Sequence, residues 1–173
     1  MNHEALAAHI RAVPDFPRPG ILFRDITPLL ASPPAFTAAT AALAERILVH
    51  RPSALVAIES RGFLFGAALA QRLGLPLLLV RKPGKLPSAT TAIEYQLEYG
   101  SDRLEIHVDA VQSGSRCAII DDVLATGGTA AATAELVRSR GGEVACLAFL
   151  LELDALGGRN RLGAATVESL LHF

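Results

Sequence analysis

Short, continuous apolar runs alternate with longer amphipathic segments through most of the chain. The apolar runs are typical of buried strands and cover residues 54–60, 76–81, 117–121, 143–153 and 167–171. Helical periodicity marks residues 35–51, 62–74 and 129–140. Continuous apolar strands separated by helices are typical of a parallel sheet covered on both faces. The pattern therefore predicts an α/β fold: an open, mostly parallel, twisted sheet with helices on both faces.

Two parts of the chain depart from this alternation. Residues 92–98 and 103–108 alternate apolar and polar positions, which predicts a half-exposed antiparallel hairpin. Near the N-terminus, a helix is expected to stop around Pro14, and an irregular loop is expected over residues 14–20. We expect both parts at the edge or rim of the sheet. Because no repeat or linker divides the chain, residues 1–173 are predicted to form a single domain.

Composition narrows the class of protein. The 173 residues are 51% hydrophobic and 19% charged, which favours one globular domain with a substantial core. The net charge of −1 gives no reason to expect nucleic acid or an anionic membrane as a partner, and Pro76 breaks an apolar run too short to span a bilayer. Cys117 and Cys146 are expected to be buried free thiols, in keeping with a reducing, cytoplasmic location, and a disulfide between them is the less favoured alternative.

Polar groups stand where three of the predicted strands end. They are Glu59 to Gly62, Arg81 with Lys82, and Asp121 with Asp122. In open α/β sheets, ligands bind beyond the carboxyl ends of the strands. We therefore expect these groups to converge on one cleft.

The turn formed by residues 125–129, Ala-Thr-Gly-Gly-Thr, joins a predicted strand to a predicted helix. Backbone N–H groups at such a junction can converge on an anion, and Thr126 and Thr129 add hydroxyl donors. An ordinary strand-to-helix turn with Thr129 as the helix N-cap explains the same residues about as well. The turn has neither the lysine of a Walker loop nor the glycine spacing of a dinucleotide-binding motif.

The acids that precede this turn favour a sugar phosphate as the ligand. Asp121 and Asp122 could accept hydrogen bonds from vicinal hydroxyl groups while the turn binds a phosphate. A solvated strand end is the plainer alternative for the two acids. Arg61 could pair with a second phosphate group, although a surface arginine beside a turn glycine is about as common.

The basic loop 82–91 carries Lys82 and Lys85 and is broken by proline and glycine. Lysines in such loops are usually only solvated, but a mobile basic loop also suits a lid over a polyphosphate. The five histidines show no metal-ligand spacing, and no Gly-x-Ser-x-Gly motif surrounds Ser60.

Several blocks of the sequence, in order, resemble the type I phosphoribosyltransferases, and within that family its adenine-specific members. The blocks are "DFPRPGILFRDITPLL", "ESRGFLFG", "RKPGKLP", "LEYGSDRLEIH", "DDVLATGGTAAA" and "LLELDALGGRNRL". Ala125 in the turn and the "FRDITPLL" block separate the chain from the hypoxanthine-guanine enzymes, which usually carry an acid in the phosphate loop. The loop "LPSATTAIEYQ" is less glycine-rich than is usual, and "FGAALA" replaces a commoner Gly-Pro form.

The resemblance implies a reaction and an architecture. Adenine and phosphoribosyl pyrophosphate would give AMP and pyrophosphate in purine salvage, with Mg²⁺ carried by phosphoribosyl pyrophosphate rather than bound directly by the protein. The family fold adds a hairpin with a flexible loop and a small N-terminal hood, about the first 30 residues here, that binds the base. The family is generally homodimeric, so a homodimer is expected.

The resemblance also implies roles for individual residues. The 5′-phosphate would be bound by Ala125, Thr126, Gly127, Gly128 and Thr129, and the ribose by Asp121 and Asp122. Pyrophosphate would face Ser60, Arg61, Lys82 and Lys85. Adenine would be bound by Leu22, Phe23, Arg24 and Leu153. Glu98 would be the flexible-loop acid near the reacting base, with Tyr99 beside it, and Glu98 and Arg61 would be the catalytic residues.

Two other functions fit parts of the sequence. One is a transferase for xanthine or another oxo-purine, which would have to read a carbonyl where adenine presents an amino group. The other is a regulator that senses phosphoribosyl pyrophosphate without catalysis. Such a regulator would need a nucleic-acid-binding surface or an added domain, and the chain shows no basic excess and no spare length.

Overall fold

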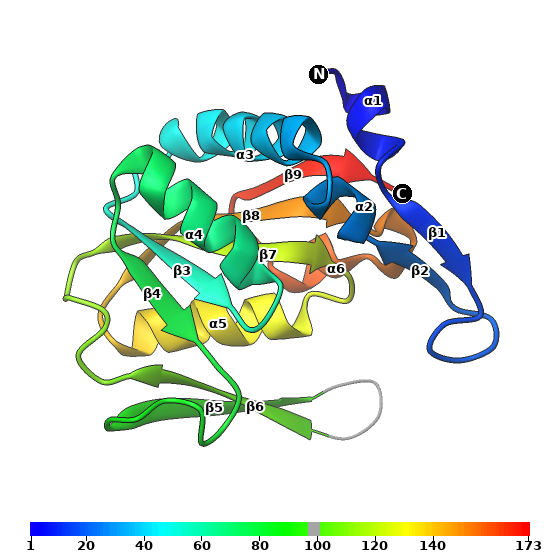
Figure 1. Ribbon diagram of the computed structural model, residues 1–173. Helices are drawn as coiled ribbons and strands as arrows, with labels where there is room; N and C mark the ends of the chain where they lie inside the picture. Colours follow the sequence, from blue (N-terminus) through cyan, green and yellow to red (C-terminus); the bar gives the residue numbers. More distant parts are fainter. Residues whose placement is uncertain (97–100) are drawn as a thin grey trace.

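A five-stranded parallel sheet forms the centre of the protein in a computed structural model that describes residues 1–96 and 101–173 (Figure 1). The strand order is β4-β3-β7-β8-β9, and every pairing is parallel. The strands are β3 (Ala54–Ile58), β4 (Leu77–Val80), β7 (Arg116–Leu124), β8 (Glu143–Glu152) and β9 (Val167–His172). This arrangement confirms the predicted α/β fold.

Helices cover both faces of the sheet, as Figure 1 shows. They are α3 (Pro33–Leu48) and α4 (Gly62–Leu73) on one face and α5 (Gly128–Ser139) on the other. Phe65 and Leu150 are buried in the core of the first face, and Ile119 and Phe149 in the core of the second. Because both faces are covered, all five residues of β3 are buried, which explains its unbroken apolar run.

The hairpin predicted after the basic loop is present. It consists of β5 (Thr90–Gln96) and β6 (Ser101–His107), which pair antiparallel. The hairpin packs against α5, and a backbone bridge between Arg81 and Glu105 joins it to the end of β4. Glu98 and Tyr99 lie outside the described residues.

The N-terminal segment differs from the prediction. Its elements are α1 (His3–Ala7), β1 (Arg11–Pro14), β2 (Leu22–Asp25) and α2 (Thr27–Leu30). The first helix ends well before Pro14, because residues 11–14 form a strand that pairs antiparallel with β2. Pro14 disfavours a helical conformation at Val13 and so favours this extended backbone. The two strands form a ribbon outside the central sheet (Figure 1).

Strand β7 is longer than predicted, and this changes the position of the two acids. Asp121 and Asp122 lie within the strand rather than at its end, and Asp121 pairs in register with Phe149. Successive side chains of a strand point to opposite faces, so the two carboxyl groups have different surroundings. Helix α5 then begins at Gly128, with Gly127 as its N-cap at a φ of 79°, so Thr129 lies in the first turn and is not the N-cap.

The chain closes with η1 (Asp154–Leu156) and α6 (Gly158–Arg161), which lie between β8 and β9. Cys117 and Cys146 are free and buried, as the sequence predicted. Among the residues that the structure describes, no helix combines the length and the hydrophobicity needed to cross a lipid bilayer.

Candidate active site

A cavity of about 320 Å³ lies at the carboxyl ends of β3, β4 and β7. It is lined by Glu59, Ser60, Arg61, Lys82, Asp121, Asp122 and Thr129. Six of these seven residues were assigned to the ribose, pyrophosphate or 5′-phosphate from the sequence. The three polar strand ends therefore converge, as expected for an open α/β sheet.

Arg61 and Asp122 form an ion pair across this cavity. Asp122 is buried, with 4% of its surface exposed, whereas about half of the Arg61 side chain is exposed. Gly62 allows this approach between α4 and β7, because a Cβ atom there would lie 2.8 Å from the carbonyl oxygen of Ile120. The glycine therefore allows close contact between two elements of the fold.

Asp121 has a different electrostatic environment. Burial, and then the neighbouring negative charge of Asp122, raise the pKa of its carboxyl group well above the ordinary value of 3.8. The backbone N–H of Asp122 donates to Asp121 Oδ1 at 2.9 Å and opposes this shift. Two adjacent acids that share one cation, Arg61, form a site suited to hydroxyl donors or to a further positive charge.

The turn before α5 encloses a second, smaller cavity of about 80 Å³ that adjoins the first at Asp121 and Thr129. Its lining includes all five residues from Ala125 to Thr129. The first N–H groups of a helix have no partner within the helix and carry its positive dipole end. The turn therefore has the geometry expected of an anion site, and its cavity is about the size of one phosphate group.

Glu59 joins the two loops that carry the predicted pyrophosphate ligands. Its carboxylate accepts hydrogen bonds from Arg81 Nη2 at 3.1 Å and from the Lys82 backbone N–H at 2.9 Å. Burial acts to raise the pKa of Glu59, but the hydrogen bonds from Arg81 and Lys82 outweigh it and hold the pKa below its usual value. Arg81 also donates to the carbonyl oxygen of Lys85 at 3.0 Å. Lys82 lines the cavity, and Lys85 does not.

The hairpin contacts both phosphate-facing regions. The Tyr95 hydroxyl lies 3.3 Å from Thr129 Oγ1, and Asp102 Oδ2 lies 3.2 Å from Lys82 Nζ. Burial is the largest cause of the raised pKa of Tyr95, which keeps its hydroxyl protonated. The hairpin therefore contacts one predicted ligand of each phosphate group.

The predicted adenine-binding residues border two cavities rather than one. Leu22, Arg24 and Leu153 line a cavity of about 730 Å³ together with Thr126 of the phosphate turn. Phe23 points to the other side of β2, into an apolar cavity of about 610 Å³ that Arg61 also lines. Arg24 borders both cavities. The β1–β2 ribbon therefore lies between the two cavities. One cavity adjoins the turn of residues 125–129 at Thr126, and the other adjoins Arg61, which was assigned to pyrophosphate.

Three residues that support the site in the structure were assigned no role from the sequence: Glu59, Tyr95 and Gly158. Glu59 was visible as an acid at a strand end, but its partners come from the neighbouring strand. Gly158 packs so closely on the phosphate turn that a Cβ atom there would lie 2.1 Å from the carbonyl oxygen of Ala125. Its signals in the sequence were the Gly-Gly pair at residues 157–158 and its place in the block "LLELDALGGRNRL".

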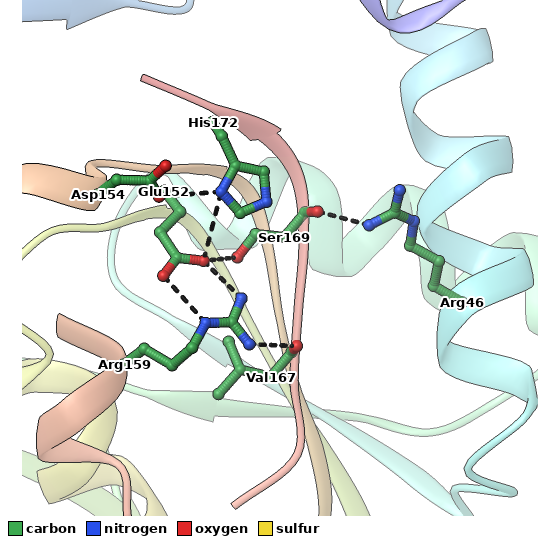
Figure 2. A network of polar contacts seen from close by, with 7 residues as sticks. All are labelled: Arg46, Glu152, Asp154, Arg159, Val167, Ser169 and His172. Carbon is green, nitrogen blue, oxygen red and sulfur yellow. Dashed lines mark hydrogen bonds and ion pairs between the residues drawn. The ribbon is translucent and has the colours of Figure 1, made fainter. Parts of the chain in front are cut away.

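One cluster in the described part of the chain has the composition of a metal site. It consists of Glu152, Asp154 and His172. Both Glu152 oxygens already accept hydrogen bonds, from Arg159 at 3.1 and 2.6 Å and from Ser169 at 2.6 Å (Figure 2). Because cationic and hydroxyl donors satisfy this buried carboxylate, the cluster is an ion-pair network rather than a metal centre.

Comparison with known proteins defines the class to which this site belongs. The family model described as phosphoribosyl transferase domain matches residues 26–163. The chain therefore belongs to the phosphoribosyltransferase family.

Relatives narrow the assignment within that family. An adenine phosphoribosyltransferase of Chloroflexus aurantiacus is 55% identical over 173 residues, all of both chains, and one of Sorangium cellulosum is 52% identical over 99% of this chain and 93% of its own. The crystal structure of the enzyme from Thermoanaerobacter pseudethanolicus has a TM-score of 0.97 at 50% identity, covering 99% of this chain and 100% of that one. The Saccharomyces cerevisiae enzyme, crystallised with adenine and an imino-altritol bisphosphate, has a TM-score of 0.92 at 41% identity, with 98% of each chain covered. The chain is grouped with the adenine phosphoribosyltransferases, which confirms the assignment made from the sequence.

Proposed function

We propose that this protein transfers the 5-phosphoribosyl group of phosphoribosyl pyrophosphate to adenine and releases AMP and pyrophosphate. One observation carries the proposal. The acidic pair of β7 and the anion-binding turn line adjoining cavities, in a chain about half identical over its full length to adenine phosphoribosyltransferases. This supports a ligand with ribose hydroxyls next to a 5′-phosphate.

Each part of phosphoribosyl pyrophosphate has a group of residues assigned to it. The N–H groups of the turn from Ala125 to Thr129 bind the 5′-phosphate, aided by the hydroxyls of Thr126 and Thr129. Asp121 and Asp122 accept hydrogen bonds from the ribose hydroxyls. The pyrophosphate lies toward Ser60, Arg61, Lys82 and Lys85.

In the reaction, a nitrogen of adenine bonds to the anomeric carbon as the bond from that carbon to pyrophosphate breaks. Positive charge develops on the sugar, as in glycoside cleavage, and negative charge accumulates on the leaving group. Arg61 and the two lysines stabilise that negative charge. Holding the adenine behind the anomeric carbon lowers the barrier further, and exclusion of water protects the activated sugar from hydrolysis.

Magnesium is the cofactor we propose, bound with phosphoribosyl pyrophosphate. The residues fit a hard cation nearby, since Asp121 and Asp122 both line the cavity assigned to ribose and pyrophosphate, and carboxylate oxygens are ligands that Mg²⁺ prefers. When bound, Mg²⁺ would neutralise charge on the pyrophosphate oxygens.

Adenine is placed against the N-terminal hood. For a base bound at β2, Phe23 would stack on it from the side of the apolar cavity, and Leu153 would close the site from the side of the other cavity. The backbone groups of Leu22 and Arg24 would read its Watson–Crick edge. Glu98 of the hairpin loop, with Tyr99 beside it, assists the proton movement on the purine. Support for the hood comes from the cavities that border β2 on both sides.

The proposal is tested by incubating the protein with phosphoribosyl pyrophosphate, Mg²⁺ and adenine, hypoxanthine or xanthine, and separating the nucleotides. AMP from adenine supports it, and a faster product from an oxo-purine favours the alternative transferase.

We further propose a cytoplasmic homodimer. Large exposed apolar side chains of the hood and α4, Phe16, Ile21, Leu22 and Leu64, support the dimer, and light scattering that finds a monomer would refute it.

A further inference from the structure

The last residue of β8, Glu152, has a buried carboxylate with three hydrogen bonds. Arg159 donates from Nε to Oε1 at 3.1 Å and from Nη2 to Oε2 at 2.6 Å, and Ser169 Oγ donates to Oε2 at 2.6 Å (Figure 2). Only 5% of Glu152 is exposed. Burial acts to raise the pKa of Glu152, but the hydrogen bonds from Arg159 and Ser169 outweigh it, so the carboxylate stays charged.

Arg159 extends this network across the end of the sheet. Its third nitrogen, Nη1, donates to the carbonyl oxygen of Val167 at 2.9 Å (Figure 2). All three guanidinium nitrogens thus bond to groups on β8 and β9. Because a guanidinium is planar and its donors are fixed in one fork, these contacts determine where the backbone of α6 lies relative to the two strands.

The residue next to Arg159 is Gly158, and it lies against the phosphate turn. A Cβ atom on Gly158 would meet the carbonyl oxygen of Ala125 at 2.1 Å and the backbone nitrogen of Gly127 at 3.1 Å. A Cβ atom on Gly127 would in turn meet the carbonyl oxygen of Gly158 at 2.4 Å. Two glycine backbones are therefore packed face to face, with no room for either to move toward the other.

We propose that Glu152 and Arg159 are positioning residues for the 5′-phosphate: by fixing α6, they hold Gly158 against Ala125 and Gly127 and so set the geometry of the anion-binding turn. This inference rests on the proposed function, and it adds residues that touch no substrate. The network and the turn belong to different segments of the chain, and the backbone of Gly158 is where they meet.

Three variants break the chain of contacts at successive points. Glu152→Gln keeps one acceptor oxygen and loses the negative charge. Arg159→Lys keeps the positive charge but loses the planar guanidinium with its several donors. Gly158→Ala adds a Cβ atom that clashes with the backbone of the turn. The matched control is Glu143→Gln. Glu143 is the first residue of β8, at the opposite end of the strand from Glu152, and it pairs with Arg116 of β7 at 3.0 Å.

The reverse reaction separates positioning from general damage, because AMP carries the 5′-phosphate and pyrophosphate does not. We expect the KM for AMP to rise about tenfold or more in all three variants, while the KM for pyrophosphate stays within about twofold of wild type. Glu143→Gln should leave both values unchanged. Thermal unfolding identifies any variant that fails to fold, and the remaining variants then decide the question.

A lower kcat with both KM values unchanged would mean only that less protein is active, and it would overturn the proposal. An equal rise in both KM values would overturn it too. The failure of the proposed function itself is distinguished by wild type, which would then convert no AMP. In that case, titration calorimetry measures the affinity of the protein for ribose 5-phosphate, whose phosphate group binds the turn. Equal affinity in wild type and Gly158→Ala would overturn the positioning role.

Discussion

The Arg61 guanidinium donates a hydrogen bond to the buried carboxylate of Asp122, and so joins the start of α4 to β7. One residue was assigned to pyrophosphate and the other to ribose. In this structure they form an ion pair, so the residues assigned to the two parts of the substrate are in direct contact.

Replacing Asp122 with asparagine should weaken sugar-phosphate binding. The variant loses a charged acceptor for a ribose hydroxyl and leaves Arg61 without a charged partner. Hydrogen bonds to charged groups contribute about 1.5–3 kcal/mol, so we expect the KM for phosphoribosyl pyrophosphate to rise roughly tenfold to a hundredfold. Steady-state kinetics with the sugar phosphate as varied substrate measures this. An unchanged KM would assign Asp122 a purely structural role.

The raised pKa of Asp121 predicts a pH-dependent cost in stability. Its folded-state pKa lies above the unfolded value, so its contribution is fully present below about pH 3.8 and is lost as the pH rises through the folded pKa. Asp121→Asn removes this loss. Urea unfolding at a series of pH values should show the variant gaining stability relative to wild type across that window.

Asp102 provides a control of opposite sign for this titration. Burial acts to raise its pKa, but hydrogen bonds from Arg103 and Lys82 lower it overall. Its contribution is therefore present above the unfolded pKa and lost as the pH falls through the folded value. The stability difference between wild type and Asp102→Asn should shrink as the pH falls. The same pH trend in both variants would contradict the assignment.

Glu59→Gln should affect the pyrophosphate end of the site. The variant loses the charge that holds Arg81 and one acceptor among those that serve Arg81 and the Lys82 backbone. If the loop that begins at Lys82 shifts, the Lys82 side chain no longer lies where it can contact pyrophosphate. We therefore expect the KM for pyrophosphate in the reverse reaction to rise about tenfold, with the KM for AMP little changed. Equal effects on the two substrates would exclude a role specific to this loop.

Glu98→Gln should mainly lower turnover. The loss in kcat is expected to be about tenfold if Glu98 only donates or accepts a hydrogen bond, and about a hundredfold or more if it moves a proton. The KM for adenine should change little. Single-turnover kinetics separates this chemical step from product release, and wild-type rates in the variant would remove Glu98 from the mechanism.

The sequence predicted the sheet well because its strands are buried on both faces, and unbroken apolar runs mark them clearly. It did not predict that β7 continues through Asp121 and Asp122, because two adjacent acids read as the end of a strand. In the structure the pairing with β8 and the Arg61 ion pair hold this polar stretch in the sheet.

The parts of the site that sequence reasoning missed depend on contacts between distant segments. Gly158 matters because it meets Ala125, more than 30 residues earlier in the chain, and no local pattern encodes such an approach. The same holds for Glu152, which falls in the predicted strand 143–153, because nothing local indicates that Arg159 is its partner. The N-terminal strand β1 was missed because its pairing with β2 overrides a helical pattern that precedes Pro14.

The central claim is tested most directly by comparing kcat/KM for adenine and for hypoxanthine, with saturating phosphoribosyl pyrophosphate and Mg²⁺ and the same enzyme preparation. A pocket whose backbone groups read the amino edge of adenine should prefer it by about a thousandfold or more. We predict AMP as the dominant product. No AMP from adenine, or faster IMP formation from hypoxanthine, would contradict the account.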